Sequence, residues 1–488
     1  MKSPAFVGID LGTTAAKAIA IAIDGTILGE SSVGYPTRRT VDGVAEQRTS
    51  DWLDAIETAI GNVVTSDVEP VSVGLCSQVN THVLVDEYRN PVAPAITWLD
   101  QRCAPIARRL TDELGHERIE QIWGGPFSID SSFSLCRYEW FRQHEPALLE
   151  HATHLLSPKD FCVAALVGTV ATDPLTPVGL VNIDGTYNEA VLALSDGFSA
   201  RQAPILPFDA LAGTSNGTLG LPSGLPVAVG TMDAWGGIFG SGAVHPGMSF
   251  EISGTSEIVG TVSSTPGSAE GVISFPPVKN RYVHAGPTQA GGDALRWVAK
   301  LLSMSATEAL QVAGEHTSAS APLLFLPHLA GERAPVWNAD ARGVWFGLTI
   351  QTDATQLIHS VLEGVAFSAR RVMECCRHAT AETVDAVRLS GGATESQLWN
   401  QVKSDVHDLS AEIVSSPSTG AIGAALMGAA AHGDHGSLDE LADRIVGVSS
   451  SLRPSSANRA RLDDLYGQYC ELYASLVEPF ARLSATPQ

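Results

Sequence analysis

The chain has 488 residues, with 30 Lys and Arg against 53 Asp and Glu, so its formal net charge is −23 at pH 7. This charge would repel nucleic-acid backbones and anionic lipid surfaces, and we expect neither nucleic acid nor membrane as a partner. An anionic ligand such as a nucleotide would need backbone N–H groups, a metal ion and a few well-placed cations. The length predicts a multidomain globular protein.

The cysteines and the N-terminus indicate where the protein works. Seven scattered cysteines form no CxxC pair, so neither a disulfide framework nor a zinc site is indicated. The opening MKSPAFVGID lacks the order of a signal peptide, and no apolar run approaches the ~20 residues of a membrane span. We therefore expect a cytoplasmic protein.

The first half of the chain alternates strands and helices. Apolar runs at 6–9 and 18–23, then the Asp24-Gly25 turn and the run 26–28, predict a hairpin. A helix follows, with Ser50 as its N-cap and an apolar stripe at Leu53, Ile56, Ile60 and Val63. Strands at 71–75 and 83–85 continue an α/β pattern.

A seam near 243–248 separates two halves that share a plan. GIDLGTTAAKAIAIA in the first half and FEISGTSEIVGTV in the second both lead an apolar strand into a Gly-Thr turn and out into another strand. We predict domains at 1–244 and 245–488. The second half continues with a long amphipathic helix at 352–372, a strand into Gly391-Gly392 and a helix from about Glu395.

Two Gly-Thr turns are candidate phosphate sites. Gly12-Thr13-Thr14 and Gly254-Thr255-Ser256 offer free N–H groups and hydroxyls, and Asp10 just before the first turn could hold Mg²⁺. A single turn of this kind would suggest only a plain hairpin, but two in similar contexts favour a pair of phosphate clamps.

Other glycine motifs are less decisive. Gly391-Gly392 suits either a tight strand-to-helix turn or a flat ligand at a helix N-terminus. The chain has no GxxxxGK[ST], no GxGxxG after a strand and no HRD loop. GTSNG at 213–217 matches a nucleophile elbow, but its proline-rich surroundings predict a loop, so a hydrolase is disfavoured.

Three further residues keep two interpretations each. Asp233, in VGTMDAWGG, could be a turn or N-cap residue or a general base. His82 is better explained as a structural histidine. Trp98, in PAITWLDQR, suits a packed surface loop or the lining of a sugar pocket.

Taken together, these motifs resemble the FGGY family of carbohydrate kinases over nearly the whole chain. The most specific match is GVWFGLTIQTDATQLIHSVLE, at 343–363, and GIDLGTTAAK, PAITWLDQR, GTMDAWGG, SGTSE and SGGATESQLWNQ follow in family order. The resemblance implies an α/β fold of two actin-like (ribonuclease H-like) domains with a nucleotide cleft between them. One signature departs from the pattern, because Arg137 stands where Lys is expected.

The resemblance also implies roles for individual residues. ATP would be bound by Thr13, Thr14, Lys17, Thr255, Gly391, Gly392 and Ser396, Mg²⁺ by Asp10, and the substrate by Val79, Asn80, Trp98 and Asp233, with Asp233 as catalytic base. The implied cofactors are ATP and Mg²⁺, and the implied partners are ATP and a small sugar or polyol. A homodimer is compatible with the sequence.

Substrate choice within the family is less sharply indicated. Val79-Asn80 and Asp233-Ala234 differ from the pairs expected of glycerol kinases, WLDQR resembles xylulose kinases, and Asp-Ala-Trp resembles ribulose-type kinases. We expect phosphorylation of a ketopentose such as xylulose at a terminal hydroxyl. The alternatives are a kinase for ribulose or an erythritol-type polyol, and an actin-fold ATPase with no sugar acceptor.

Overall fold

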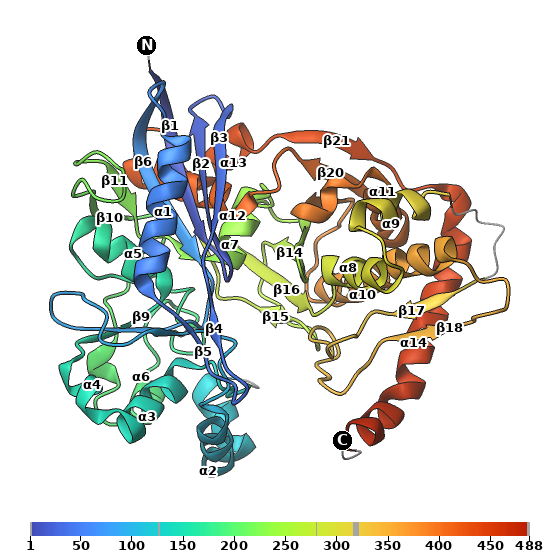
Figure 1. Cartoon of the computed structure of the whole chain (residues 1–488), viewed down its shortest axis with the longest axis horizontal. Coiled ribbons are helices and arrows are strands. Elements are labelled where there is room, and N and C mark those ends of the chain that lie inside the picture. The colour runs from blue at the N-terminus through green and yellow to red at the C-terminus, as the bar shows by residue number, and fades with distance from the viewer. Residues whose placement is uncertain (1, 125–126, 280, 316–321, 486–488) are drawn as a thin grey trace. The chain divides into compact units, whose positions relative to one another are not determined.

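The computed structural model describes residues 2–124, 127–279, 281–315 and 322–485. The chain forms two compact units (Figure 1). Unit 1 comprises Met1–Gly240 and Ser418–Val446, and unit 2 comprises Ser241–Pro417 and Gly447–Gln488. The division of the chain into compact units therefore differs from the predicted halves, because the segment 418–446 packs with the first unit.

Unit 1 is built on a mixed sheet in the order β10-β11-β6-β1-β2-β3, with β12 also paired to β6. The strands alternate little in polarity because the central ones are buried on both faces. The strands of this sheet are β1 (Ser3–Leu11), β2 (Ala15–Ala22), β3 (Ile27–Gly34), β6 (Val68–Ser77), β10 (Leu211–Thr214), β11 (Pro226–Ala228) and β12 (Thr231–Met232). Short strands outside it are β4 (Arg38–Arg39), β5 (Ala45–Gln47), β7 (Val83–Val85), β8 (Ala95–Ile96) and β9 (His154–Leu156).

Helices cover this sheet, and α1 packs on β2 and β3 (Figure 1). The helices of unit 1 are α1 (Thr49–Val63), α2 (Ala104–Trp123, interrupted at Gly115), α3 (Ser134–His144), α4 (Pro146–His151), α5 (Pro158–Val167), α6 (Glu189–Leu192), η1 (Ser199–Arg201), α7 (Asp233–Gly240), α12 (Thr419–His432) and α13 (Leu438–Ile445). The predicted helix at α1 is confirmed, but Ser50 is not its N-cap. The helix begins at Thr49, two residues before the start that a Ser50 cap would give, and its N-cap is Arg48, which makes no side-chain capping bond.

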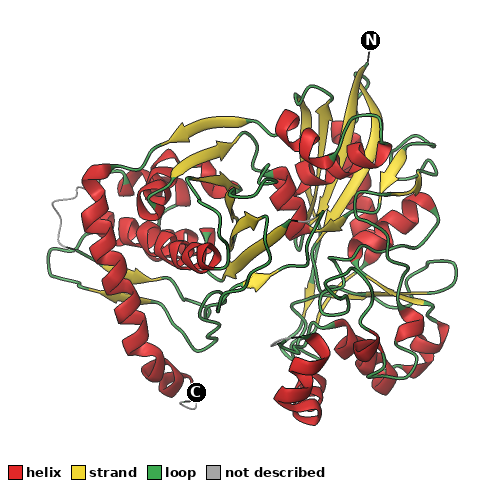
Figure 2. Ribbon diagram, turned by 180° about the vertical axis from the view of Figure 1, so that it is seen from behind, coloured by secondary structure: helices red, strands yellow, loops and turns green. Residues whose placement is uncertain are grey.

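Unit 2 repeats the arrangement with a sheet in the order β15-β16-β14-β13-β19-β20-β21. Its strands are β13 (Ser249–Ser253), β14 (Glu257–Ser263), β15 (Ile273–Ser274), β16 (Tyr282–Thr288), β19 (Ala386–Ser390), β20 (Ser410–Val414) and β21 (Val448–Leu452), with β17 (Leu324–Leu326) and β18 (Val344–Phe346) paired apart. Its helices, seen from behind in Figure 2, are α8 (Gly292–Leu301), α9 (Ala306–Ala313), α10 (Ala354–His378), η2 (Gly392–Glu395), α11 (Gln397–His407) and α14 (Ser456–Ser484). Asp353 caps α10 in a capping box with Gln356.

The internal repeat predicted from the two Gly-Thr turns is confirmed by the sheet topology. In unit 1 the antiparallel hairpin β1–β2 lies beside parallel β6, and in unit 2 the hairpin β13–β14 lies beside parallel β19. The register also corresponds, because Asp10 pairs with Cys76 and Ile252 pairs with Ser390, each two residues before the glycine of its turn. The Gly12 N–H donates to the Ala15 carbonyl at 3.0 Å, and the Gly254 N–H donates to the Ser256 carbonyl at 2.8 Å.

Helix α12 contacts the sheet of unit 1 and α7 through glycine. A Cβ atom on Gly74 of β6 would lie 1.8 Å from the Ala424 carbonyl oxygen, and one on Gly8 of β1 would lie 1.9 Å from the Ala421 carbonyl oxygen. On the other side of the helix, a Cβ on Gly423 would lie 1.9 Å from the Gly236 carbonyl oxygen of α7. The backbones of these elements touch directly, which no residue with a side chain would allow.

The candidate nucleophile elbow is excluded by its surroundings. Gly213 and Thr214 end the edge strand β10, and residues 215–225 lead through turns into β11 rather than into a helix. A nucleophile elbow requires a strand followed at once by a helix. In the described part of the chain, no helix is long and apolar enough to cross a bilayer.

We predict that Gly74→Ala destabilises the protein by roughly 3 kcal/mol, because its Cβ has no space against the Ala424 carbonyl. The free energy of unfolding, measured by denaturant titration, checks this. Gly61→Ala is the matched control: Gly61 is exposed on α1 with nothing within 4 Å of the added Cβ, so it should gain up to about 1 kcal/mol. Equal effects of the two substitutions would contradict the close contact.

Candidate functional site

The first Gly-Thr turn, between β1 and β2, is held at three points. The Tyr35 hydroxyl donates to the Gly12 carbonyl. The Gln47 amide donates to the Thr13 carbonyl at 2.8 Å, and the Trp98 indole N–H donates to the Thr13 hydroxyl at 3.0 Å. Thr14 and Lys17 are exposed at the same turn. Thr13, predicted to bind ATP, and Trp98, predicted to bind substrate, are therefore in direct contact.

Two carboxylates meet at the end of the unit 1 sheet. Asp10 lies on β1 beside Cys76 of β6, whose thiol approaches the Asp10 carboxylate at 3.6 Å and the Gly420 carbonyl at 3.3 Å. Asp233 follows β12, where Met232 pairs with Ser77 of β6, and it begins α7. Both carboxylates are half-buried. The structure thus brings together the predicted metal ligand and the predicted base.

The electrostatics of this pair favour protonation. Burial raises the pKa of Asp233 to about 7, and the nearby negative charge of Asp10 adds to the effect, against a hydrogen bond from the Ala234 N–H at 2.8 Å. Burial also raises the pKa of Asp10, against the opposing charge of Lys17. The bond to Ala234 is the local capping contact considered for Asp233, and it leaves the carboxylate at a pKa suited to proton transfer near pH 7.

A buried ionic network holds the strand that leads to Asp233. The ammonium of Lys159, fully buried on α5, contacts the Asp160 carboxylate, lies 3.1 Å from Asp173 and donates to the Val229 carbonyl at 3.3 Å. Asp173 in turn accepts a 2.8 Å hydrogen bond from the Thr231 hydroxyl of β12. Residues on both sides of Gly230 are therefore fixed, which sets where α7 begins.

The remaining predicted substrate residues lie at the same end of β6. Val79 and Asn80 follow β6 and are half-buried, and Asn80 has a φ of 56°. Asn80 lines a cavity of about 30 Å³ together with His82, Ser134, Asp160, Thr176 and Tyr187, among others. Among the described residues, His82 Nδ1, Ser134 Oγ and Thr176 Oγ1 are buried without a hydrogen-bond partner. At about 30 Å³ this cavity has room for one water-sized group, such as a single hydroxyl.

Unit 2 places the predicted nucleotide residues at one edge of its sheet. Thr255 is exposed at the turn after β13, and Gly391 follows β19, the parallel neighbour of β13. Gly391 has a φ of 87°, and a Cβ on it would lie 2.3 Å from the Ser253 carbonyl oxygen. Gly392 is exposed beside it. The Ser396 hydroxyl accepts from the Trp399 N–H at 3.2 Å and so caps α11.

Two arginines that the sequence did not point to lie at the second turn. Arg296 donates to the Thr255 hydroxyl at 3.3 Å, and Arg333 donates to the Ser256 hydroxyl at 3.0 Å. The N-terminus of α8 adjoins them, because the Gly292 N–H donates to the Gly254 carbonyl at 2.9 Å. One local pattern concerned Arg296: it lies three residues after Asp293, with which it forms an ion pair. Guanidinium groups bind phosphate well, so the two arginines are candidate phosphate ligands.

A buried ionic network also underlies the second turn. Lys403 of α11 contacts the Glu251 carboxylate and donates to Ser253 at 2.5 Å and Glu257 at 2.6 Å, and His407 lies 2.8 Å from Glu251. Burial disfavours the ionised form of both carboxylates. Lys403 and His407 nevertheless hold the pKa of Glu251 below its ordinary value, whereas burial raises the pKa of Glu257. Lys403 thereby ties α11 to both strands of the β13–β14 turn.

The residues present fit a magnesium ion held mainly by ligand and water. Among the described residues, no group of three or more His, Cys, Asp or Glu side chains is arranged to bind a metal. Mg²⁺ commonly takes one or two carboxylates together with substrate phosphates and water. Asp10, whose pKa is raised by burial, supplies such a carboxylate. The absence of a side chain at Gly420 leaves space beside it, because a Cβ there would lie 2.5 Å from Asp10 Oδ2.

Comparison with protein families agrees with this fold. Residues 5–240 match the N-terminal domain, and residues 251–432 the C-terminal domain, of the FGGY family of carbohydrate kinases. The chain belongs to this family, and the protein is a carbohydrate kinase. The predicted fold class, two actin-like, ribonuclease H-like domains, is confirmed.

Relatives with two different names are similar to the chain. A gluconokinase of Bacillus subtilis (strain 168) is 25% identical over 462 residues, covering 90% of each protein. A xylulose kinase of Escherichia coli (strain K12) is 28% identical over 494 residues, covering 97% of this chain and 99% of the relative. The solved structure of a ligand-bound xylulose kinase from Lactobacillus acidophilus aligns with a TM-score of 0.88 at 22% identity, over 98% of this chain and 100% of that one.

We predict that Asp233→Asn stabilises the ligand-free protein at pH 8 but not at pH 4. A folded-state pKa of about 7 lies above the ordinary value of 3.8, so the native state binds the extra proton and wild-type stability falls as pH rises from about 4 through 7. The neutral amide avoids this loss. Denaturant titration should show a gain of roughly 1–3 kcal/mol at pH 8 and little change at pH 4.

Asp112→Asn, on the exposed surface of α2, is the matched control and should show no such pH-dependent gain. A gain from Asp233→Asn that is equally large at pH 4 would contradict the raised pKa.

Proposed function

We propose that the protein transfers the γ-phosphate of ATP to a terminal hydroxyl of a neutral ketopentose such as xylulose, with Asp233 as general base. The observation that carries this proposal is the position of Asp233. It lies at the end of the unit 1 sheet, beside Asp10 and in register with the strand that leads to Val79 and Asn80, and burial raises its pKa to about 7.

A carboxylate in this state suits removal of a proton from an attacking alcohol. Near pH 7 Asp233 is ionised in a large fraction of molecules, and its raised basicity favours accepting the proton as the oxygen attacks phosphorus. Lys159 and Asp173 fix the strand before it, so the carboxylate keeps its place at the sheet edge. Pre-positioning of this kind is the main contribution a protein makes to phosphoryl transfer.

Each Gly-Thr turn carries groups that suit phosphate. In unit 1, Thr13, Thr14 and Lys17 offer hydroxyls and a cation at the turn after Asp10. In unit 2, Thr255 lies among Arg296, Arg333 and the N-terminus of α8, and Gly392, exposed and with nothing within 4 Å of an added Cβ, leaves room for the nucleoside. Magnesium held through Asp10 would neutralise charge on the phosphates.

A neutral substrate is favoured over a sugar acid, although both kinds of kinase are among the relatives. The cations around the predicted sugar residues are already paired: Arg102 with Asp100 and Glu46, Arg137 with Asp100, and Lys159 with Asp160 and Asp173. The cavity beside Asn80 contains the Asp160 carboxylate, and burial together with Arg137 lowers the pKa of His82 to about 3, so its imidazole is neutral. A substrate carboxylate would meet no available charge there.

We predict that Asp233→Asn lowers kcat for sugar phosphorylation by roughly 10²–10⁴-fold while ATP binding changes little. Sugar-dependent ADP release measures the first quantity, and calorimetric titration with a non-hydrolysable ATP analogue measures the second. Asp112→Asn should match the wild type in both. Wild-type activity in the Asp233→Asn protein would refute its assignment as base.

We also predict the order of substrates in an ADP-release screen with ATP and Mg²⁺. Xylulose or ribulose should give a kcat/KM at least about 100-fold above that of gluconate, because Arg102, Arg137 and Lys159 are already paired with carboxylates of the protein. Erythritol and glycerol test the shorter polyols. Gluconate as the best substrate would contradict the neutral-sugar proposal, and turnover of ATP that no sugar stimulates would favour the ATPase alternative.

A further inference from the structure

We propose that Arg137 is a positioning residue for the sugar side of the site: it fixes the loop Thr97–Asp100 and thereby holds the Trp98 indole against the Thr13 turn. This inference rests on the proposed function, in which Trp98 contacts the substrate. It concerns the residue at which the first family signature departs from Lys, and which has no part in the proposed chemistry.

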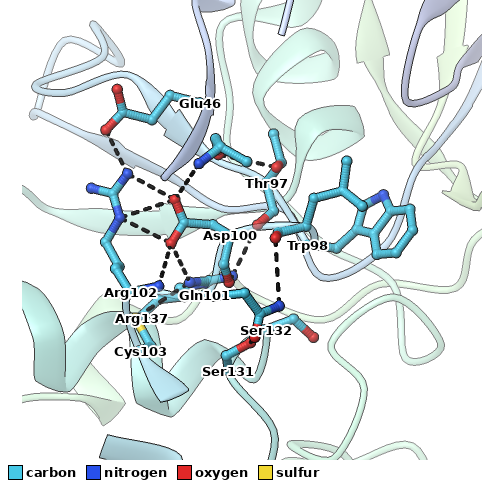
Figure 3. Close-up of polar contacts among 12 residues, drawn as sticks. Glu46, Thr97, Trp98, Asp100, Gln101, Arg102, Cys103, Ser131, Ser132 and Arg137 are labelled. Atoms are coloured by element: carbon cyan, nitrogen blue, oxygen red, sulfur yellow. Dashed lines mark hydrogen bonds and ion pairs between the residues drawn. The ribbon is translucent and has the colours of Figure 1, made fainter. Parts of the chain in front are cut away.

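The guanidinium of Arg137 is fully buried and binds the loop Thr97–Asp100 (Figure 3). One terminal nitrogen donates to two backbone carbonyls, those of Thr97 at 2.9 Å and Asp100 at 3.0 Å. The other donates to the Asp100 carboxylate at 3.3 Å and to the Cys103 sulfur at 3.3 Å. Arg137 therefore contacts both ends of the four-residue segment that contains Trp98.

The Asp100 carboxylate is the second anchor of the same loop (Figure 3). It is fully buried, accepts the Ala45 N–H at 2.7 Å and the Arg102 N–H at 2.9 Å, and pairs with the Arg102 guanidinium at 2.8 Å. Arg102 also reaches Glu46 at 2.6 Å. Two arginines and two carboxylates thus compensate one another, so the loop is tied to β5 without an unpaired buried charge.

Trp98 is held by one hydrogen bond from its backbone and one from its side chain. Its backbone N–H donates to the Thr81 hydroxyl at 3.2 Å, and its indole N–H donates to the Thr13 hydroxyl at 3.0 Å. The indole itself is 41% exposed, so packing alone does not fix it. The orientation of this ring depends on where its backbone is placed, and Arg137 places that backbone.

Lysine could not make these contacts at once. The planar guanidinium projects several N–H groups in fixed directions, whereas an ammonium is a single point of charge on a flexible stem. A lysine at position 137 would keep its charge near Asp100 but could not also satisfy the carbonyls of Thr97 and Asp100 in the same geometry. Arg137→Lys therefore loosens the loop while conserving charge.

The test compares Arg137→Lys with Arg142→Lys, a matched control on the same helix. Arg142 is half-exposed and pairs only with Glu139 among the described carboxylates. We expect Arg137→Lys to raise the sugar KM by about fivefold or more while the ATP KM stays within about twofold. Arg142→Lys should leave both unchanged. An equal rise in both KM values would overturn the proposal.

A double-mutant cycle shows whether Arg137 acts through Trp98. In a Trp98→Phe background the additional rise in sugar KM caused by Arg137→Lys should fall to within about twofold. The same fold-change in both backgrounds would mean that Arg137 does not act through the indole, and the proposal would fail.

A fluorescence measurement separates this inference from the proposed function. Acrylamide quenching of each protein, with its Trp98→Phe counterpart subtracted, reports on Trp98 alone, and it should increase in Arg137→Lys but not in Arg142→Lys. If the quenching changes and no sugar is phosphorylated, the proposed function fails and the positioning role stands. If sugar is phosphorylated and the quenching does not change, the positioning role fails. If Arg137→Lys is unstable, the same measurements are made on Arg137→Gln, whose side chain keeps an N–H donor but has no charge.

Discussion

The site in unit 1 depends on the direct backbone contact between α12 and the elements it covers. Gly8 and Gly74 bring β1 and β6 against one side of this helix, and Gly423 meets Gly236 of α7 on another. Asp10 lies two residues after Gly8, Cys76 two after Gly74, and Asp233 three before Gly236, so the same contacts that pack the helix set the distances among these groups. Protein interiors tolerate little change in such packing. The proximity of the two carboxylates follows from that constraint, and through it the charge of Asp10 contributes to the raised pKa of Asp233.

An acidic protein that binds an anionic substrate has few cations available for it. In this structure the lysines and arginines near the two turns make two kinds of contact. Lys159, Arg137 and Lys403 are buried and paired with carboxylates, where each joins segments distant in the sequence. Arg333, and Arg296 while paired with the exposed Asp293, reach the hydroxyls of the second Gly-Thr turn. Buried pairs of the first kind add little net stability but fix geometry, because leaving either partner alone would be costly. The positions of Trp98, Asp233 and Thr255 each trace back to one of these pairs.

Local patterns in the sequence predicted the local structure but not the pairings between segments that are distant in the sequence. The Gly-Thr turns, the Asp24-Gly25 hairpin and the capped helix α10 follow from nearby residues, so each was predictable. The return of α12 to unit 1 was not, because the glycine contacts described above join residues 187 to 413 positions apart. Arg296 and Arg333 went unnoticed for the same reason: their value lies in contacts with Thr255 and Ser256 across the fold. Ser50 was a reasonable cap by residue type, yet the chain already turns helical at Thr49.

The two units share one plan but differ at the positions of their predicted ligand contacts. The loops that follow β6 and β19 occupy equivalent places, since Cys76 and Ser390 pair with corresponding residues of β1 and β13. In unit 1 this loop carries Val79 and Asn80, and in unit 2 it carries Gly391 and Gly392. At the position two residues before each turn's glycine, unit 1 has Asp10 and unit 2 has Ile252. The first threonine of each turn differs as well: the Thr13 hydroxyl accepts from an indole, and the Thr255 hydroxyl accepts from a guanidinium. Under the proposed function, divergence at these few positions suits one copy to a hydroxylated substrate with an acid beside it, and the other to phosphate and a nucleoside.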